Sequence, residues 1–210
     1  SLIGAAGDDL FLMGTGTILI GTIDGGGDAG DTIDGGDTGT LYRINAPDAG
    51  VLQSRLTGFS GIRNLVGGTA ADTFRFEGAG SLDGTVDAGD GEDSLLTTDG
   101  VDAVTLTATD AGTGLINTVT TSFMATENVD LRSGDDTFIV TAGASLTGTL
   151  SGGIGSDTLV GPDSGATFNV TANNQGELLD AAGAIKLLGT APVTPGFSSI
   201  ENLTGGAGND

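Results

Sequence analysis

The 210-residue chain carries 28 acidic and six basic residues, which gives a formal net charge of −22, and it contains no His and no Cys. This charge argues against binding to nucleic acid, because phosphate contacts need Lys and Arg, and it opposes binding to anionic lipid. The 40 glycines disfavour long helices, whereas an apolar fraction of 37% is too high for a disordered acidic tail. No apolar run is long enough to span a bilayer, so we expect many short strands joined by tight turns.

The first eleven residues introduce a unit that recurs along the chain. It reads Ser-Leu-Ile-Gly-Ala-Ala-Gly-Asp-Asp-Leu-Phe, and related segments occupy 64–74, 128–138 and 202–210. The equivalent aspartates of the four segments, at spacings of 63, 64 and 74 residues, are Asp9, Asp72, Asp136 and Asp210. A long internal repeat of this kind sets the fold class before local propensity does.

Each long repeat contains a shorter period. Asp31 follows Asp9 after 22 residues, and Asp93 and Asp157 follow their own partners after 21. A looser third turn comes 17 to 22 residues later, at 48–51, 110–115 and 174–178. Every long repeat therefore divides into three segments of similar length.

These periods predict an all-β fold, a right-handed parallel β-solenoid with about 21 residues per coil and three coils per long repeat. We expect repeats at 1–63, 64–127 and 128–201, an extra loop near 180–192, and the start of a fourth repeat at 202–210, in one continuous solenoid. The expected inward ladder consists of Phe11, Ile33, Phe74, Leu95, Phe138 and Leu159, with Leu52, Leu115 and Leu178 in the third coils. Two packed β-sandwiches are the alternative, although a 63-residue repeat is short for that class.

Three asparagines recur immediately before an apolar residue, at Asn64, Asn128 and Asn202. One interpretation is that they form buried hydrogen bonds in the turns, as stacked asparagines do in repetitive β structures. The other is that they are surface turn residues.

Residues 152–160 read Gly-Gly-Ile-Gly-Ser-Asp-Thr-Leu-Val, a glycine-rich turn followed by a short strand. This nonapeptide resembles the repeat of RTX-type, or haemolysin-type, calcium-binding proteins. Residues 4–12 and 205–210 are closely similar to it, and 67–75 and 88–96 are similar in part. The resemblance implies that Ca²⁺ lies between neighbouring coils, held by turn carbonyls and carboxylates. The candidate ligands, carried over position by position, are Asp9, Asp31, Asp72, Asp93, Asp136, Asp157 and Asp210.

The chain departs from that family because the motif does not recur every nine residues and every third segment lacks it. The expectation is therefore of isolated ions between paired coils rather than a continuous ladder. Electrostatics supports a cation independently, since two carboxylates about 4.8 Å apart repel by about 1 kcal/mol in water and about 3.5 kcal/mol at an effective dielectric constant of 20. The alternative is that aspartate favours turns and points into water.

The whole chain also resembles the repeat arrays of giant haemagglutinin-like bacterial surface adhesins. That resemblance implies an extracellular rod or fibre at the cell surface, which associates end to end or continues into further repeats and has cell-surface glycans as possible ligands. Catalysis is not expected, because the chain has no His, no Cys and no Gly-x-Ser-x-Gly element. Two alternatives stay open, a carbohydrate-binding solenoid module and a calcium-dependent polysaccharide-modifying enzyme.

Overall fold

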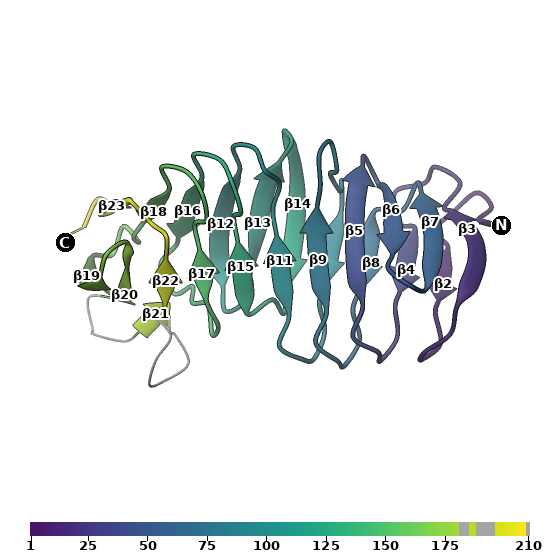
Figure 1. Cartoon of the computed structure of the whole chain (residues 1–210), viewed down its shortest axis with the longest axis horizontal. Helices are drawn as coiled ribbons and strands as arrows, with labels where there is room; N and C mark the ends of the chain where they lie inside the picture. Colours follow the sequence, from purple (N-terminus) through teal and green to yellow (C-terminus); the bar gives the residue numbers. More distant parts are fainter. Residues whose placement is uncertain (181–184, 188–195, 209–210) are drawn as a thin grey trace.

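The computed structural model describes residues 1–180, 185–187 and 196–208. These residues form two long sheets wound into a solenoid, with strands crossing the long axis and the termini at opposite ends (Figure 1). The expected all-β solenoid is confirmed. The described part of the chain contains no helix that is long and apolar enough to cross a membrane.

The larger sheet, called sheet A, has 13 strands. Its order is β1 (Leu2–Ile3), β3 (Leu19–Asp24), β7 (Leu56–Ser60), β6 (Ala49–Leu52), β5 (Leu41–Ala46), β9 (Thr73–Phe76), β11 (Ser94–Leu96), β15 (Asn128–Asp130), β17 (Leu150–Ser151), β22 (Phe197–Ser198), β20 (Gln175–Asp180) and β19 (Ala166–Ala172), and β21 (Ile185–Leu187) pairs with β20.

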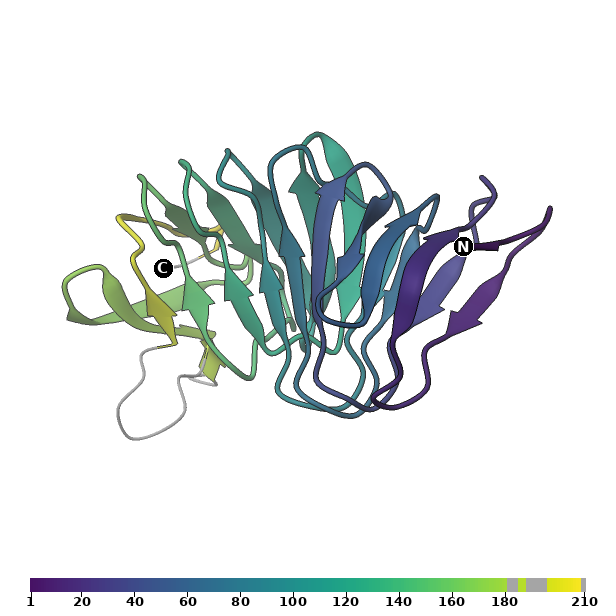
Figure 2. The same cartoon turned by 45° about the vertical axis from the view of Figure 1, so that its right-hand side comes forward.

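The second sheet, called sheet B, has ten strands. Its order is β2 (Leu10–Leu12), β4 (Thr32–Asp34), β8 (Asn64–Val66), β10 (Thr85–Asp87), β14 (Val119–Met124), β13 (Ala111–Ile116), β12 (Ala103–Ala108), β16 (Thr137–Val140), β18 (Thr158–Val160) and β23 (Asn202–Thr204). Figure 2 shows the two sheets as the opposite walls of the solenoid.

A complete coil contributes one short strand to each sheet, and equivalent strands of successive coils pair in parallel. Leu2 pairs with Ile23, 21 residues further on, and Thr73 pairs with Ser94 at the same separation. These registers confirm the coil of about 21 residues. Gly-Asp turns suit this winding, because glycine permits the tight reversals between strands.

The third segment of each repeat differs from the expected third coil. Strands β5, β6 and β7 form an antiparallel meander within sheet A, and β12, β13 and β14 form one within sheet B. In the third repeat, β19 and β20 form the corresponding hairpin in sheet A. The first hairpin turns of these units contain Asp48, Asp110 and Asn174 at φ values of 50°, 52° and 56°. Asp and Asn tolerate this left-handed conformation, so the looser turns of the sequence are hairpin turns.

The meander leaves each repeat with an odd number of passages between the sheets. As a result, successive repeats exchange sheets: Asp9 precedes β2 in sheet B, Asp72 precedes β9 in sheet A, and Asp136 precedes β16 in sheet B again. The single inward ladder predicted from the sequence is therefore divided between two sheets.

The core lies between the sheets and consists mainly of apolar side chains. Five members of the predicted ladder are at most 1% exposed, and these are Ile33, Phe74, Leu95, Phe138 and Leu159. Phe11 is half-buried at the end of the solenoid. Leu52 and Leu178 are buried as expected, but the prediction for Leu115 was wrong: it is 47% exposed, because Ile116 is the residue of β13 that faces the core. The loop expected near 180–192 lies largely outside the described residues.

Candidate cation sites at the two edges of the solenoid

The turns between the sheets form two edges. We call the edge where the chain passes from sheet A to sheet B the A-to-B edge, and the opposite one the B-to-A edge. Asp9, Asp31, Asp136 and Asp157 lie on the A-to-B edge, whereas Asp72 and Asp93 lie on the B-to-A edge. Asp210 lies outside the described residues.

The aspartates expected to pair between coils are direct neighbours. The backbone N–H of Asp9 donates to Oδ1 of Asp31 at 2.9 Å. In the same way, the N–H of Asp72 donates to Asp93 at 2.6 Å. The third pair is Asp136 and Asp157, at 2.9 Å. One carboxylate oxygen of each second aspartate is therefore used to hold the preceding coil in register.

The columns of carboxylates extend beyond the residues predicted from the sequence. Asp102 precedes Asp136 in its column and donates its N–H to that carboxylate at 2.7 Å. Glu127 ends the column of Asp93 and Glu201 ends that of Asp157, each accepting from the aspartate N–H, at 2.7 and 2.9 Å. A signal for the two glutamates was present, because each immediately precedes one of the recurring asparagines.

The second carboxylate oxygen has no hydrogen-bond partner among the described residues. This holds for the buried Oδ2 atoms of Asp9, Asp31, Asp72, Asp93, Asp136 and Asp157. Five of these six residues are at most 1% exposed, and Asp9 is half-buried. A buried polar atom without a partner is costly, and buried charges in proteins are ordinarily paired or bound to a metal.

The first glycine of the motif lies between the unpaired carboxylate oxygen and a backbone carbonyl oxygen of the neighbouring coil. A Cβ on Gly67 would overlap the carbonyl oxygen of Ala88 and would lie 2.7 Å from Oδ2 of Asp72. A Cβ on Gly152 would likewise meet the Ser199 carbonyl and Oδ2 of Asp157. In these two turns, and at Gly4 and Gly25 beside Asp9 and Asp31, the carboxylate oxygen therefore lies near a carbonyl oxygen of the neighbouring coil, with only a Cα–H, a weak donor, between them.

This environment raises the pKa values of the buried carboxyls. Burial is the largest cause for Asp72 and Asp136, and it raises the pKa of each to about 7. The Thr40 N–H and the Arg55 charge lower the pKa of Asp72, but burial outweighs them. Burial also raises the pKa of Asp93, Asp157 and Glu127. Each of these carboxyl groups is therefore stabilised either by protonation or by a bound cation.

The donor chemistry fits a hard cation such as Ca²⁺, which takes carboxylate and carbonyl oxygens. Within the part of the chain that the structure describes, no three or more His, Cys, Asp or Glu side chains form a metal-binding group. Any ion would thus draw much of its coordination from turn carbonyls, as the glycine-rich backbone permits.

A comparable cluster of carbonyl oxygens binds the side chain of Arg55. This guanidinium, 7% exposed, lies at the B-to-A edge in the loop between β6 and β7. Its acceptors are the carbonyl oxygens of Met13, Gly14, Thr17 and Gly35 and the hydroxyl of Thr40. The edge therefore already binds a positive group where the chain supplies one.

The recurring asparagines hydrogen-bond in the turns. Oδ1 of Asn64 accepts from the N–H of Thr85 at 3.2 Å, and Oδ1 of Asn128 accepts from that of Thr149 at 3.1 Å. The side-chain amide of Asn202 donates to the Asp157 carbonyl at 3.2 Å. The first two asparagines are half-buried and Asn202 is exposed, so each holds neighbouring coils together without belonging to the core.

Comparison of the chain with protein-family models, with curated proteins and with solved structures gives no match.

Proposed function

We propose that this chain is a structural segment of an extracellular bacterial surface protein, a stiff solenoid rod whose coils are held together by Ca²⁺. The observation that carries the proposal is the set of buried Oδ2 atoms, exemplified by Asp72 and Asp157, that have no hydrogen-bond partner within residues 1–180, 185–187 and 196–208. Those of Asp9, Asp31, Asp72 and Asp157 lie beside carbonyl oxygens of the neighbouring coil, where a cation would join one coil to the next.

Stiffness follows from the way a solenoid is stabilised. Each coil contacts only its neighbours, so the stability of the rod is approximately the sum of coil and coil–coil terms. Calcium would supply positive charge between carboxylates that otherwise repel one another. Asp31, Asp93 and Asp157 would then hold the ion with Oδ2 while Oδ1 keeps the hydrogen bond to the preceding coil.

The proposal includes an adhesive role at the cell surface, with glycans as ligands and with rods extended end to end. Its support is the resemblance of the repeats to those of surface adhesins and the net charge of −22, which disfavours nucleic acid as a partner.

Thermal unfolding with and without calcium tests the proposal. One occupied site at 100 times its Kd contributes about 2.7 kcal/mol, so saturating Ca²⁺ should raise Tm by about 5–10 °C over the value in chelator. Mg²⁺ should do less, because it retains its water shell. The double variant Asp72→Asn with Asp93→Asn should lose part of the increase, whereas the exposed Asp37→Asn should keep all of it. Equal Tm values in Ca²⁺ and in chelator would disprove calcium stabilisation.

A further inference from the structure

The outer face of sheet A carries two arginines side by side near the middle of the solenoid. Arg43 of β5 and Arg75 of β9 are register partners on neighbouring parallel strands, so their Cα atoms lie about 4.8 Å apart. Their side chains are 43% and 37% exposed, and both strands lie well away from the two ends of the molecule (Figure 1). One small area of surface therefore holds two of the six basic residues of the chain.

The two guanidinium groups share a single carboxylate, that of Glu77. Arg43 donates to it from Nε and Nη2, and the shortest of these contacts is 2.7 Å. Nε of Arg75 lies 3.0 Å from Oε1 of Glu77, but this ion pair lacks hydrogen-bond geometry, and the Nε has no hydrogen-bond partner among the described residues. Hydrogen bonds from Arg43 are the largest cause that holds the pKa of Glu77 below its ordinary value, so this carboxylate stays ionised near neutral pH. The cluster therefore has two positive charges and one negative charge.

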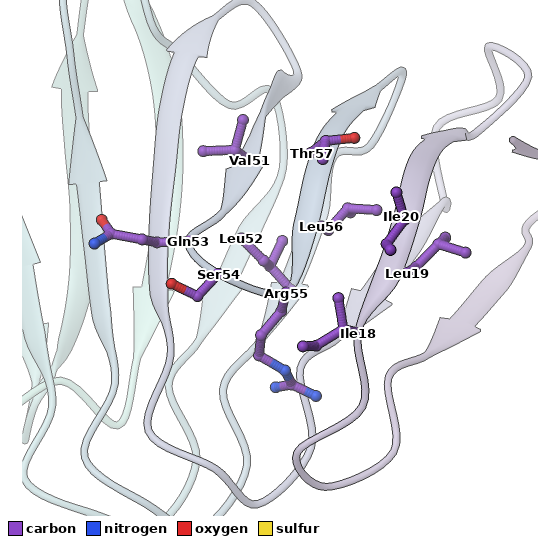
Figure 3. Close-up of a pocket in the computed structure, with 10 residues that line it drawn as sticks. All are labelled: Ile18, Leu19, Ile20, Val51, Leu52, Gln53, Ser54, Arg55, Leu56 and Thr57. Atoms are coloured by element: carbon purple, nitrogen blue, oxygen red, sulfur yellow. The ribbon is translucent and has the colours of Figure 1, made fainter.

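Three other arginines have acceptors of their own within the fold. Arg55 borders a hollow of about 420 Å³ (Figure 3) and donates to carbonyl oxygens of the turns. Arg63 lies 3.4 and 3.9 Å from two carboxylates. Arg132 donates to two backbone carbonyls and forms a 2.9 Å ion pair with a third group, a carboxylate. The pair of Arg43 and Arg75 differs from these, because in the described part of the chain two guanidinium groups have one acceptor group between them.

The fold does not require a charged pair at this position. One repeat further along the solenoid, the equivalent positions hold Thr105 of β12 and Ile139 of β16, which pair in the same parallel register. The residue equivalent to Glu77 is Thr141. Like charges on neighbouring strands repel one another, so this repeat carries a cost that the next repeat avoids. A repulsion retained on an exposed face points to an anion that the chain does not itself supply.

The surface around the pair favours an anion. Strands β5, β6, β9 and β11 contain no acidic residue, and the first acidic residue in the row of Arg75 is Asp130 of β15. At physiological ionic strength, charges more than about 8 Å away are largely screened. The acids at the two edges of the solenoid therefore oppose an anion here less than the two arginines attract it.

We propose that this surface binds a polysaccharide that carries carboxylates, a uronate polymer, through Arg43 and Arg75. This inference rests on the proposed adhesive role and names its surface and ligand class. The Nη atoms of Arg75 have no acceptor among the described residues, and a guanidinium group can hold a carboxylate with two parallel hydrogen bonds. A ligand carboxylate would thus lie beside that of Glu77.

The neighbouring side chains suit a sugar better than a protein. Thr73 of β9 and Ser94 of β11 are register partners at half-buried positions of the same face, where their hydroxyl groups can bond to those of a saccharide. Strands β5, β6, β9 and β11 expose no large apolar side chain. A protein partner would find no apolar anchor there, and such anchors carry most of the energy of protein interfaces.

Isothermal titration with a galacturonate oligomer tests the proposal. Chelator is present, so that calcium does not bridge the sugar and the chain. The parent chain should bind the oligomer, and Arg75→Gln should bind it at least about tenfold more weakly, because charge-assisted hydrogen bonds are lost. Arg63→Gln is the matched control and should bind as the parent does, since Arg63 is a 32% exposed arginine with carboxylate partners at another place. A parent chain that does not bind, or equal binding by Arg75→Gln, would overturn the proposal.

Thermal unfolding separates a binding role of Arg75 from a structural one. Arg75→Gln removes a repulsion, so without ligand its Tm should equal or exceed that of the parent. The oligomer at saturation should raise the Tm of the parent but not that of the variant. A variant that unfolds at a lower temperature and still binds the oligomer would show that Arg75 serves the fold instead.

The class of ligand is decided by two further probes. The methyl ester of the same oligomer has no charge and should not bind, and a polyglutamate peptide of equal charge should bind more weakly than the oligomer. Equal or tighter binding of the peptide would replace the glycan by an acidic polypeptide. Failure of the oligomer, with a neutral glycan bound instead, would refute this surface and leave the adhesive role. Binding of the oligomer in chelator, with no effect of calcium on Tm, would refute calcium stabilisation alone.

Discussion

Two clusters of oxygen atoms lie between the coils on the B-to-A edge, and they differ in whether the chain supplies a donor for them. In the first, Arg55 donates to the carbonyl oxygens of Gly14 and Gly35 and to the hydroxyl of Thr40. In the second, Asp72 and Asp93 bring carboxylates against turn carbonyls, and their Oδ2 atoms have no donor among the described residues. Thr40 links the two clusters, since its N–H donates to Asp72 at 2.6 Å.

The difference between the clusters lies in the source of positive charge. The Arg55 cluster contains its own cation. In that cluster Thr40 occupies the position that Asp102 occupies in the next repeat. The Asp72 cluster must take a proton or an ion from solution, because burial makes an uncompensated carboxylate costly. We therefore expect the first cluster to be indifferent to calcium and the second to depend on it.

The largest expected effect concerns the close approach of the coils on which both clusters depend. Gly153 has φ +95°, and a Cβ there would overlap the Arg132 carbonyl of the neighbouring coil. Gly153→Ala should cost about 4 kcal/mol, from backbone strain and overpacking together. Gly7→Ala is the control: its φ is +109° but nothing lies within 4 Å, so it should cost only about 1–2 kcal/mol. Equal losses in denaturant unfolding would show that the coils need not lie so close.

The next largest effect removes the resident cation. Arg55→Leu leaves several buried carbonyl oxygens without donors, and we expect a loss of about 3 kcal/mol that added Ca²⁺ does not change. Arg43→Leu is the matched control, because Arg43 forms a 2.7 Å ion pair with Glu77 at the surface, with 43% of its side chain exposed. That change should cost less than about 1 kcal/mol. A calcium-dependent loss at Arg55 would contradict the division between the two clusters.

The stability of the folded chain should depend on pH through the buried carboxyls. The folded pKa values of Asp72 and Asp136 are about 7, above the ordinary value of 3.8. The folded state therefore retains protons that the unfolded chain releases, so stability is complete below about pH 4 and declines as pH rises to about 7. In chelator we expect Tm to fall by about 5 °C across this window, and Ca²⁺ should restore it. A Tm that rises from pH 4 to 7 in chelator would show that these carboxyls are not buried as described.

The smallest effect has opposite signs under two conditions. Asp72→Asn keeps an acceptor for the Thr40 N–H and offers an NH₂ donor to the Ala88 carbonyl, so it should stabilise the chain in chelator at pH 8 by about 1 kcal/mol. In saturating Ca²⁺ the same variant should be less stable than the parent, because a ligand is lost. Thermal unfolding under both conditions measures the two signs. An equal gain in stability in chelator and in saturating Ca²⁺ would indicate that Asp72 does not bind a metal.

Much of the architecture could be predicted from the spacing of aspartates, because a solenoid places residues one coil apart in contact. The separations of 21 and 22 residues correspond to the strand registers of the structure. The pairs Asp9–Asp31 and Asp136–Asp157 are hydrogen-bonded neighbours. The third segment could not be predicted this way. Its Asp-Ala-Gly turns at Asp48 and Asp110 resemble the other turns in composition, yet they reverse the strand within one sheet instead of passing to the other.

The candidate sites were predicted only in part, for a related reason. A motif identifies residues that resemble one another, so it found Asp72 and Asp93 but not Glu127, which completes their column with a different side chain. It also did not reveal Arg55, which lies in a hairpin loop whose sequence is not repeated elsewhere. Such contacts join segments whose separation follows no period.

Local periodicity in the amino-acid sequence is enough to predict the strand-and-turn class, the length of a coil and the alignment of like residues in neighbouring coils. Three features are visible only in the folded chain. The repeats exchange sheets, the buried carboxylates keep one oxygen without a hydrogen-bond partner in the described part of the chain, and Arg55 occupies one edge. Burial and long-range donor geometry depend on how the meanders set one coil against the next, and local spacing does not contain that information.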